Sequence, residues 1–284
     1  MTMYQHIPQY IDPVAFSIGF LSIRWYSLMY LVAFAVVYGL LSWRIRKGEG
    51  GGIARELETV QQVVDDWILA GAVALIVGAR IGYVLLYDLP FFVQHPFLIV
   101  WPIDPVSGGY VGLAGMSYFG GVTGVLLASG WFLRRKKIDL LRFADFVVPA
   151  IPAGYVFGRL GNFLNGELYG RVTAVSWGMY FPNGGLTTLR HPSQLYEMFF
   201  EGIALFCCLW PLRNSNWLRN RSLFVYFIGY GIFRFGIEFF REPDFQLGLV
   251  LLGLSLGQLL AIGIALIGIG GLCWKGVNRE ETSG

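Results

Sequence analysis

Long apolar runs separated by short polar segments make up most of this chain. Most of them approach or exceed the ~20 apolar residues that an α-helix needs to cross the hydrocarbon core of a bilayer. The pattern predicts an all-α, polytopic integral membrane protein with about seven transmembrane helices. We expect a single transmembrane domain over residues 1–284, with a small outer-face segment around 159–192. The apolar runs cover residues 16–43, 67–87, 110–133, 143–158, 195–212, 223–240 and 247–274.

The composition agrees with a membrane protein and disfavours other classes. Charged residues make up 14% of the chain and hydrophobic residues 55%, whereas a soluble domain has about 25% charged residues. The net charge of +3 is too small to suggest a nucleic-acid partner, and no nucleic-acid-binding motif is present. The cysteines at 207, 208 and 273 lack the spacing of a metal site or a disulfide framework, which favours apolar packing.

Lys and Arg gather in the segments between alternate apolar runs. Because these residues concentrate in the cytoplasmic loops of membrane proteins, we expect an outer amino terminus and a cytoplasmic carboxyl terminus. No Lys or Arg precedes Arg24, so no cleavable signal peptide is expected. The basic segments assigned to the cytoplasmic side are 44–55, 134–142, 213–221 and 275–279.

The remaining arginines fall within the apolar runs or on the outer side. A charged residue inside a span costs about 2.5–3.5 kcal/mol on insertion scales and usually faces a bundle interior or a cavity. Several arginines in the outer half of one bundle suggest an anionic ligand, and the planar guanidinium suits phosphate. These residues are Arg24, Arg80, Arg159, Arg171, Arg190, Arg234 and Arg241.

The stretch Gly158–Gly170, GRLGNFLNGELYG, follows an apolar run directly. It brings together Arg159, Asn162, Asn165 and Glu167. Prolines upstream and the glycines within it predict that the helix breaks here, and such backbone is tolerated at membrane depth where it lines a polar cavity. The alternative is an ordinary helix end capped by Asn and Gly.

A second polar stripe lies on the sixth run. Tyr230, Arg234, Glu238 and Arg241 are spaced i, i+4, i+8 and i+11, so they cover one helix face of about 80°. One interpretation is a structural Arg234–Glu238 pair. The other is an anion site in which Glu238 orients an arginine.

Three further candidate site elements each have alternative interpretations. Tyr26, four residues before Tyr30, is either an interfacial anchor or part of a site. Arg80 either pairs with another group or snorkels, or it binds a ligand. The segment His191–Glu197 is either a polar site element or a helix start capped by Ser193. The pairs Gly120/Gly124, Gly154/Gly158 and Gly253/Gly257 have the spacing of close helix packing.

These blocks together resemble the bacterial prolipoprotein diacylglyceryl transferases. The resemblance rests on a 13-residue signature and four further blocks in family order, and it covers nearly the whole chain. The blocks are Trp25-Tyr26 with Met29-Tyr30, Gly78–Tyr83, Gly158–Gly170, His191–Glu197, and Gly229–Gly231 with Arg234 and Glu238–Arg241.

The resemblance implies an enzyme of the bacterial inner membrane with its active site toward the outer face. It would move the diacylglyceryl group of phosphatidylglycerol onto the lipobox cysteine of a prolipoprotein, without cofactor or metal, forming a thioether and releasing glycerol phosphate. Arg159 and Arg234 match the family's catalytic arginines and, with Asn162 and Tyr230, would bind the lipid. Supporting positions are Tyr26, Asn165, Glu167, Gly170, Glu238 and Arg241.

One residue departs from the family pattern. Phe119 stands where many members have a His discussed as a base for the thiol, and Phe moves no proton. A Cys thiol is already a few per cent thiolate at neutral pH, and nearby arginines lower its pKa further. The rival interpretation of the same arginines is a non-enzymatic anion transporter or lipid-binding bundle.

Overall fold

The computed structural model describes residues 3–19, 21–54, 59–100, 115–185, 187–242, 249–251 and 253–280. The chain is mostly helical and forms two compact units. The first combines Met1–Lys47 with Leu141–Gly284, and the second is Gly48–Leu140. Arg55 and the first residues of the third and seventh apolar runs (110–114 and 247–248) lie outside the described residues.

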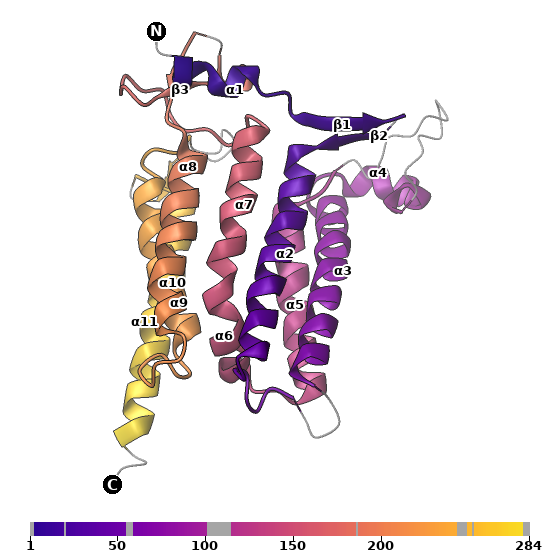
Figure 1. The fold of residues 1–284 in the computed structure, drawn as a ribbon. Coiled ribbons are helices and arrows are strands. Elements are labelled where there is room, and N and C mark those ends of the chain that lie inside the picture. Colours follow the sequence, from indigo (N-terminus) through magenta and orange to yellow (C-terminus); the bar gives the residue numbers. More distant parts are fainter. Residues whose placement is uncertain are drawn as a thin grey trace. The chain divides into compact units, whose positions relative to one another are not determined.

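Helices dominate the first unit, in which α10 and α11 lie side by side (Figure 1). Its helical elements are η1 (Met3–His6), α1 (Ile7–Tyr10), α2 (Trp25–Arg46), α6 (Leu140–Val147), η3 (Val148–Ala150), α7 (Ile151–Leu164), η4 (Pro182–Gly184), α8 (Ser193–Glu197), the π-helix η5 (Met198–Ala204), α9 (Leu205–Leu212), α10 (Ser222–Ile237) and α11 (Leu256–Glu280). Its antiparallel hairpins pair β1 (Val14–Ile18) with β2 (Leu21–Arg24), β3 (Met179–Tyr180) with β4 (Leu189–Arg190), and β5 (Leu249–Leu251) with β6 (Leu254–Ser255).

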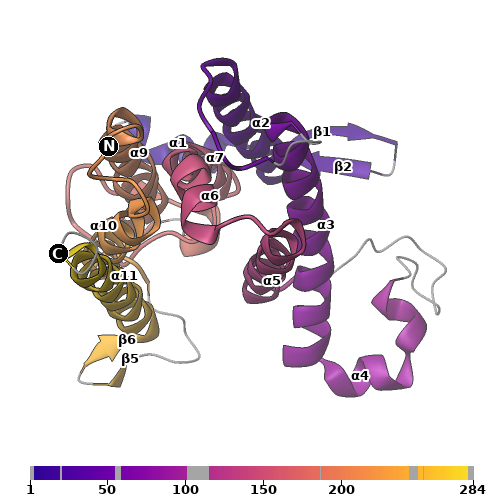
Figure 2. The same cartoon turned by 90° about the horizontal axis from the view of Figure 1, so that it is seen from below.

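The second unit contains α3 (Val60–Leu86), α4 (Leu89–Gln94), η2 (Pro96–Ile99) and α5 (Tyr118–Lys136). A capping box starts α3, because Thr59 accepts from the Gln62 backbone N–H and Gln62 accepts from that of Thr59. Figure 2 shows α3 and α5 running side by side.

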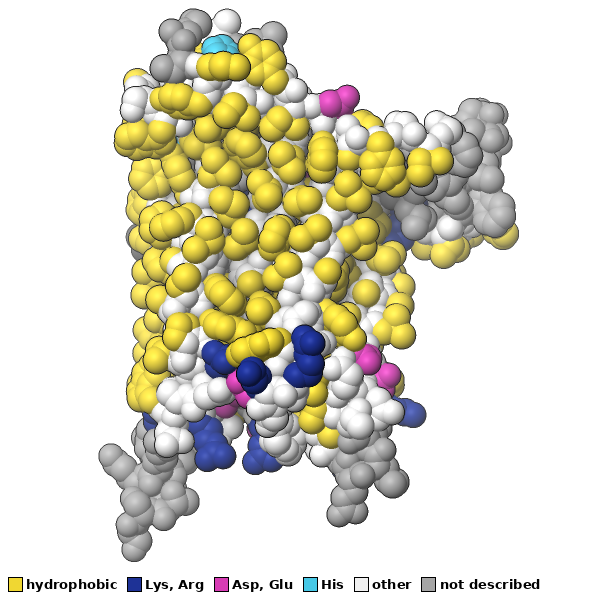
Figure 3. Space-filling model, viewed as in Figure 1, with side chains coloured by type: hydrophobic (Ala, Val, Ile, Leu, Met, Phe, Trp, Pro, Cys, Tyr) yellow, Lys and Arg dark blue, Asp and Glu magenta, His cyan; other side chains and the backbone are white. Residues whose placement is uncertain are grey.

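In the part of the chain that the structure describes, five helical segments are long and apolar enough to cross a membrane, and helices overlap every predicted apolar run. The prediction of a mostly helical, multi-pass membrane protein is therefore confirmed. On the face drawn in Figure 3, hydrophobic side chains cover the middle of the helices and Lys and Arg side chains gather at helix ends. Of the other two predicted spans, α10 is a shorter apolar helix and the third run corresponds to α5. The five segments are Trp25–Arg46, Val60–Leu86, Leu140–Leu164, Ser193–Leu212 and Leu256–Lys275.

The fourth run does not break at its prolines. Pro149 lies in the 3₁₀ turn η3 and Pro152 in the first turn of α7, where the missing N–H of proline leaves no helical bond unmade. The helix continues through Arg159 and Asn162 and ends at Asn165.

Glycine allows close helix packing at some of the predicted positions only. On α5, Gly120 and Gly124 face Gly78 and Gly82 of α3 so closely that a Cβ on Gly78 would lie 2.5 Å from Gly120 O. The other two pairs behave differently. Gly154 abuts α2 while nothing lies within 4 Å of a Cβ on Gly158, and Gly253 occupies a turn at φ +73°.

We predict that Gly78→Ala lowers the thermal unfolding midpoint of the detergent-solubilised protein. The added methyl group would overlap the α5 backbone, and overpacking of this kind costs about 1–3 kcal/mol. The matched control is Gly71→Ala on the same helix, where nothing lies within 4 Å of the added Cβ and alanine favours the helix. Equal midpoints for the two variants would contradict this account of the α3–α5 contact.

Candidate active site

The stretch Gly158–Gly170 is half helix and half turn. Arg159 and Asn162 lie on the last turns of α7, and Asn165 is its C-cap. Gly166 follows at φ +66°, the left-handed conformation that commonly ends helices. The interpretation of this stretch as a helix end with Asn and Gly is therefore correct. The turn also keeps Glu167 close to Asn162, since the Glu167 backbone N–H donates to Asn162 O over 3.1 Å.

Gly170 joins this turn to two distant parts of the chain. Its backbone forms an antiparallel bridge with Arg241, and its N–H donates to His191 O over 2.8 Å. A Cβ here would lie 2.2 Å from Phe240 O and 2.8 Å from His191 Cβ. Only glycine allows these backbones to meet so closely, and the contact places the end of α10 next to the stretch.

Glu197, the last residue of α8, lies at the centre of the site. One carboxylate oxygen, Oε1, is 3.2 Å from Arg234 Nη1 and 3.1 Å from Arg241 Nη1. The other, Oε2, is 2.7 Å from Arg159 Nε. Three arginines far apart in the sequence thus share a single carboxylate.

Burial differs between the carboxylate and its arginines. The Glu197 side chain is 1% exposed, whereas those of Arg159, Arg234 and Arg241 retain 12%, 13% and 16%. A carboxylate this deeply buried is stable only when it is paired. The arginine side chains are therefore more accessible than the carboxylate with which they pair.

Arg234 and Arg159 each bind a further polar side chain besides Glu197. Glu238 Oε2 is 2.8 Å from Arg234 Nη2, and Glu238 Oε1 accepts from Ser255 Oγ over 3.0 Å. Arg159 Nη1 donates to Asn162 Oδ1 over 3.1 Å, and Asn162 Nδ2 donates to Glu167 Oε1 over 2.9 Å. The expected Arg234–Glu238 pair exists, but it is one part of a larger cluster.

The two tyrosines among the candidates contact α7 from different helices. Tyr26, in the first turn of α2, shares a 2.9 Å hydrogen bond with Tyr30 and packs on Gly161, whose added Cβ would lie 3.4 Å from Tyr26 Cα. Tyr230 of α10 packs edge-on against the ring of Tyr155 of α7 at 6.4 Å between centroids. Asn165 Oδ1 is buried without a hydrogen-bond partner in the described part of the chain.

Four outer arginines do not join the cluster. Arg24 is the last residue of β2, and the other three donate to backbone carbonyls. Arg80, within the second unit, donates to the backbone carbonyls of Leu98, Ile99 and Gly115. In the first unit, Arg171 donates to Arg241 O over 2.9 Å, and Arg190 donates to Gly184 O over 2.7 Å. Their guanidinium groups hold the backbone together, so the broad inference of an anion ligand for all outer arginines narrows to Arg159, Arg234 and Arg241.

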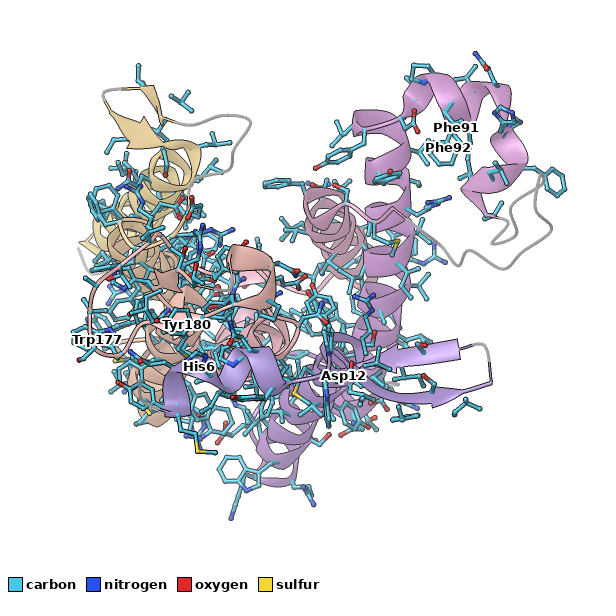
Figure 4. All side chains as sticks on the ribbon, turned by 90° about the horizontal axis from the view of Figure 1, so that it is seen from above. His6, Asp12, Phe91, Phe92, Trp177 and Tyr180 are labelled. Atoms are coloured by element: carbon cyan, nitrogen blue, oxygen red, sulfur yellow. The ribbon has the colours of Figure 1, made fainter. Side chains whose placement is uncertain are left out.

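The segment between the stretch and α8 is tied to the N-terminal residues. The His6 ring stacks on Tyr180 of β3 at 4.6 Å, and Gln5 Nε2 donates to Ser176 O over 3.0 Å. Figure 4 shows His6 beside Tyr180, with Trp177 further along the same segment. At the end of this segment, burial lowers the pKa of the His191 imidazole, because removal from water disfavours its charged form.

Sequence reasoning missed residues that complete the site. The sequence indicates Glu197 only as the last residue of the His191–Glu197 block. The interpretation of Ser193 as a helix cap is wrong, because its Oγ donates to Leu168 O over 2.9 Å. Tyr155 and Glu201 were not singled out. The available signals were a glutamate one turn after Glu197 and a tyrosine one turn before Arg159. Within the described residues, no group of three or more His, Cys, Asp or Glu side chains is placed to hold a metal ion.

Fold and site together define a multi-pass helical membrane protein with a buried arginine–glutamate cluster. The family model described as prolipoprotein diacylglyceryl transferase matches residues 13–274, and the chain belongs to this family.

Named relatives are similar in sequence to this chain over almost its full length. The phosphatidylglycerol–prolipoprotein diacylglyceryl transferase of Chlorobaculum tepidum is 46% identical over 286 residues, covering 99% of this chain and 96% of the relative. Its namesake in Coxiella burnetii is 43% identical over 284 residues, covering 99% and 100%. That of Pseudoalteromonas translucida is 43% identical over 265 residues, covering 93% and 92%.

We predict that Glu197→Gln lowers the thermal unfolding midpoint strongly. The substitution keeps the shape but removes the shared counter-charge of the three arginines, and breaking a buried ion pair costs about 3–5 kcal/mol. The control is Glu242→Gln, because the Glu242 side chain pairs with Arg190 at 48% exposure and an exposed pair contributes about 0–1 kcal/mol. An equally small shift for both variants would show that Glu197 does not hold the cluster together.

Proposed function

We propose that this protein transfers the diacylglyceryl group of phosphatidylglycerol to the lipobox cysteine of a prolipoprotein, the first step of bacterial lipoprotein maturation. Family membership and the substrates named for its relatives support the reaction. The observation that carries the proposal is the convergence of Arg159, Arg234 and Arg241 on buried Glu197. A phosphodiester is an anion that such partly exposed guanidinium groups recognise.

The bond changes explain why arginines are needed. The cysteine sulfur attacks the diacylglyceryl carbon that carries the phosphate ester, and a carbon–sulfur bond forms as the carbon–oxygen bond breaks. The electron pair leaves on the phosphate oxygen of glycerol phosphate, and the thiol proton passes to solvent or to the leaving phosphate. Arg159 and Arg234 bind the phosphodiester and stabilise the charge that develops on the leaving oxygen.

Neighbouring residues keep these arginines in place. Asn162 and Glu238 orient Arg159 and Arg234 through the contacts described above. Tyr230 contributes to lipid binding, and Glu167 is available to position the thiol or the glycerol group. Tyr26, Asn165, Gly170 and Arg241 support the geometry around the lipid.

For the membrane arrangement we propose about seven spans in one transmembrane domain. The five long segments are joined by α5 and α10, two further helices that coincide with apolar runs of the sequence. The positions of the basic segments support an outer amino terminus and a cytoplasmic carboxyl terminus. The active site then faces the outer side of the bacterial inner membrane, where secreted precursors arrive.

We expect Arg159→Lys to lower the rate of transfer by ~10²–10³, the effect of losing one positioned donor at a developing oxyanion. Lysine keeps the charge but lacks the planar fork that binds a phosphate through two parallel bonds. The assay incubates purified protein with phosphatidylglycerol micelles and a lipobox peptide and follows the lipidated peptide by mass spectrometry.

Arg221→Lys serves as the control, since Arg221 lies at the other end of α10 and donates to Trp217 O. It should react at the wild-type rate. Near-normal turnover of both Arg159→Lys and Arg159→Ala would contradict the assigned role. Lipid binding by the wild-type protein without any covalent product would instead favour a transporter or a lipid-binding bundle.

We expect Phe119→Leu to keep the rate within about threefold, because an aromatic ring takes no part in proton transfer. Phe119 is in the first turn of α5 and 55% exposed, so a smaller apolar residue is tolerated there. The complementary variant Phe119→His should not accelerate the reaction by more than about threefold, whereas general base catalysis contributes 10²–10⁴. A loss above a hundredfold in Phe119→Leu, at an unchanged unfolding midpoint, would contradict this expectation.

A further inference from the structure

Tyr155 contacts Arg159 in two ways. The tyrosine lies one turn before the arginine on α7, and its hydroxyl accepts a 2.7 Å hydrogen bond from Arg159 Nε. Its ring also lies beneath the guanidinium, with Arg159 Cζ 4.8 Å from the ring centroid. A hydrogen bond along one edge and a ring along one face together restrict the guanidinium plane.

Glu201 holds Tyr155 from the neighbouring helix. The Tyr155 hydroxyl donates to Glu201 Oε2, so the hydroxyl accepts from the arginine and donates to the carboxyl group at the same time. Glu201 is 1% exposed, and in the described part of the chain its Oε1 has no hydrogen-bond partner. A carboxyl group buried this deeply is costly, and the hydroxyl of Tyr155 is the hydrogen-bond donor that it receives.

Backbone geometry brings the two residues together. Glu201 lies in the π-helix η5, a rare conformation often found at functional sites. The next residue, Gly202, lies so close to α7 that a Cβ would be 2.6 Å from Val156 Cγ2 and 3.4 Å from Pro152 O. The wide turn and the missing side chain let Glu201 reach Tyr155.

The contacts of Arg159 among the described residues involve two of its three guanidinium nitrogens. Nε contacts Tyr155 and Glu197, and Nη1 donates to Asn162. Within the described residues, no hydrogen bond or ion pair engages Nη2. That nitrogen is the one available to an incoming anion, provided that the plane of the group is kept fixed.

We propose that Tyr155 and Glu201 are positioning residues that hold the Arg159 guanidinium in the plane in which its Nη2 nitrogen meets the phosphodiester. The proposal rests on the proposed transfer reaction. It adds two residues that do not touch the lipid and act only through Arg159. Arginine carries about 2 kcal/mol of rotamer entropy, so an unrestrained side chain would populate many orientations in which Nη2 does not face the phosphodiester.

The test compares variants that remove each link of this chain of contacts. Tyr155→Phe keeps the ring and removes the hydroxyl, and Glu201→Leu keeps the volume and removes the acceptor. Each should lower kcat/KM for phosphatidylglycerol by ~10–100-fold, because small misplacements of a binding group have effects of this size. KM for the lipobox peptide should not change. Glu201→Gln should stay within about threefold of wild type, since its amide oxygen still accepts from Tyr155.

A comparison of the double variant with the single variants distinguishes a positioning role from a general loss of structure. The double variant of Tyr155→Phe and Glu201→Leu should be no worse than the more affected single variant, because both act through the same arginine. Tyr169→Phe is the control for losing a tyrosine hydroxyl, since Tyr169 donates to Asn183 O away from the cluster. It should retain wild-type kinetics. Thermal unfolding midpoints of all variants are measured in parallel.

Three outcomes would overturn the positioning role: a wild-type rate in Tyr155→Phe, multiplying losses in the double variant, or equal losses for both substrates that follow the unfolding midpoint. The wild-type protein in the same assay tests the proposed function itself. Absence of lipidated peptide with the wild type would remove both proposals. Equal adduct formation by wild type and Tyr155→Phe would remove the positioning role alone.

Discussion

A single buried carboxylate organises the site of this protein. Glu197 is almost fully enclosed and balances three arginines, one from α7 and two from α10 and the turn that follows it. A charge at that depth is stable only when its partners are brought to it. The helices must therefore approach one another in a particular register, and the same requirement leaves the guanidinium groups closer to the surface than the carboxylate. The arrangement that keeps Glu197 paired also brings together the arginines that we propose for anion binding.

Glycine and backbone geometry make this arrangement possible. Gly170 lets the turn after α7 touch the end of α10, and Gly202 lets the π-helix η5 lie against α7. Neither position tolerates a side chain without displacement of backbone or neighbours. The polar side chains then lie within contact distance of one another. Asn162 binds Arg159 and Glu238 binds Arg234, in addition to Glu197, and Tyr155 links Arg159 to Glu201. The cluster is thus rigid because several independent backbone contacts determine its geometry.

Arginine serves two purposes in this protein, and the distinction lies in its acceptors. Arg80, Arg171 and Arg190 donate to backbone carbonyls and hold irregular segments together, and the one carboxylate that Arg190 also meets, Glu242, is exposed. In contrast, Arg159, Arg234 and Arg241 pair with buried carboxylates, which hold their guanidinium groups in place. We propose that these guanidinium groups also bind the anionic substrate. A guanidinium has five donors in a fixed fork, so both uses are chemically natural. Burial of the partner and the identity of the acceptor separate a structural arginine from one in a binding site.

The sequence alone determined the helices, because apolar length needs no tertiary information, and it determined the local pair Arg234–Glu238, because helical periodicity places i and i+4 together. It also identified most polar residues of the site. Only the tertiary structure decided that Glu197 unites three arginines, that Tyr155 and Glu201 stand behind Arg159, and that the outer arginines divide into two groups. Periodicity defines the faces of one helix but not which faces of two helices meet. The sequence also does not show which acceptor an arginine side chain will bind. Packing between segments that are distant in the chain supplies both.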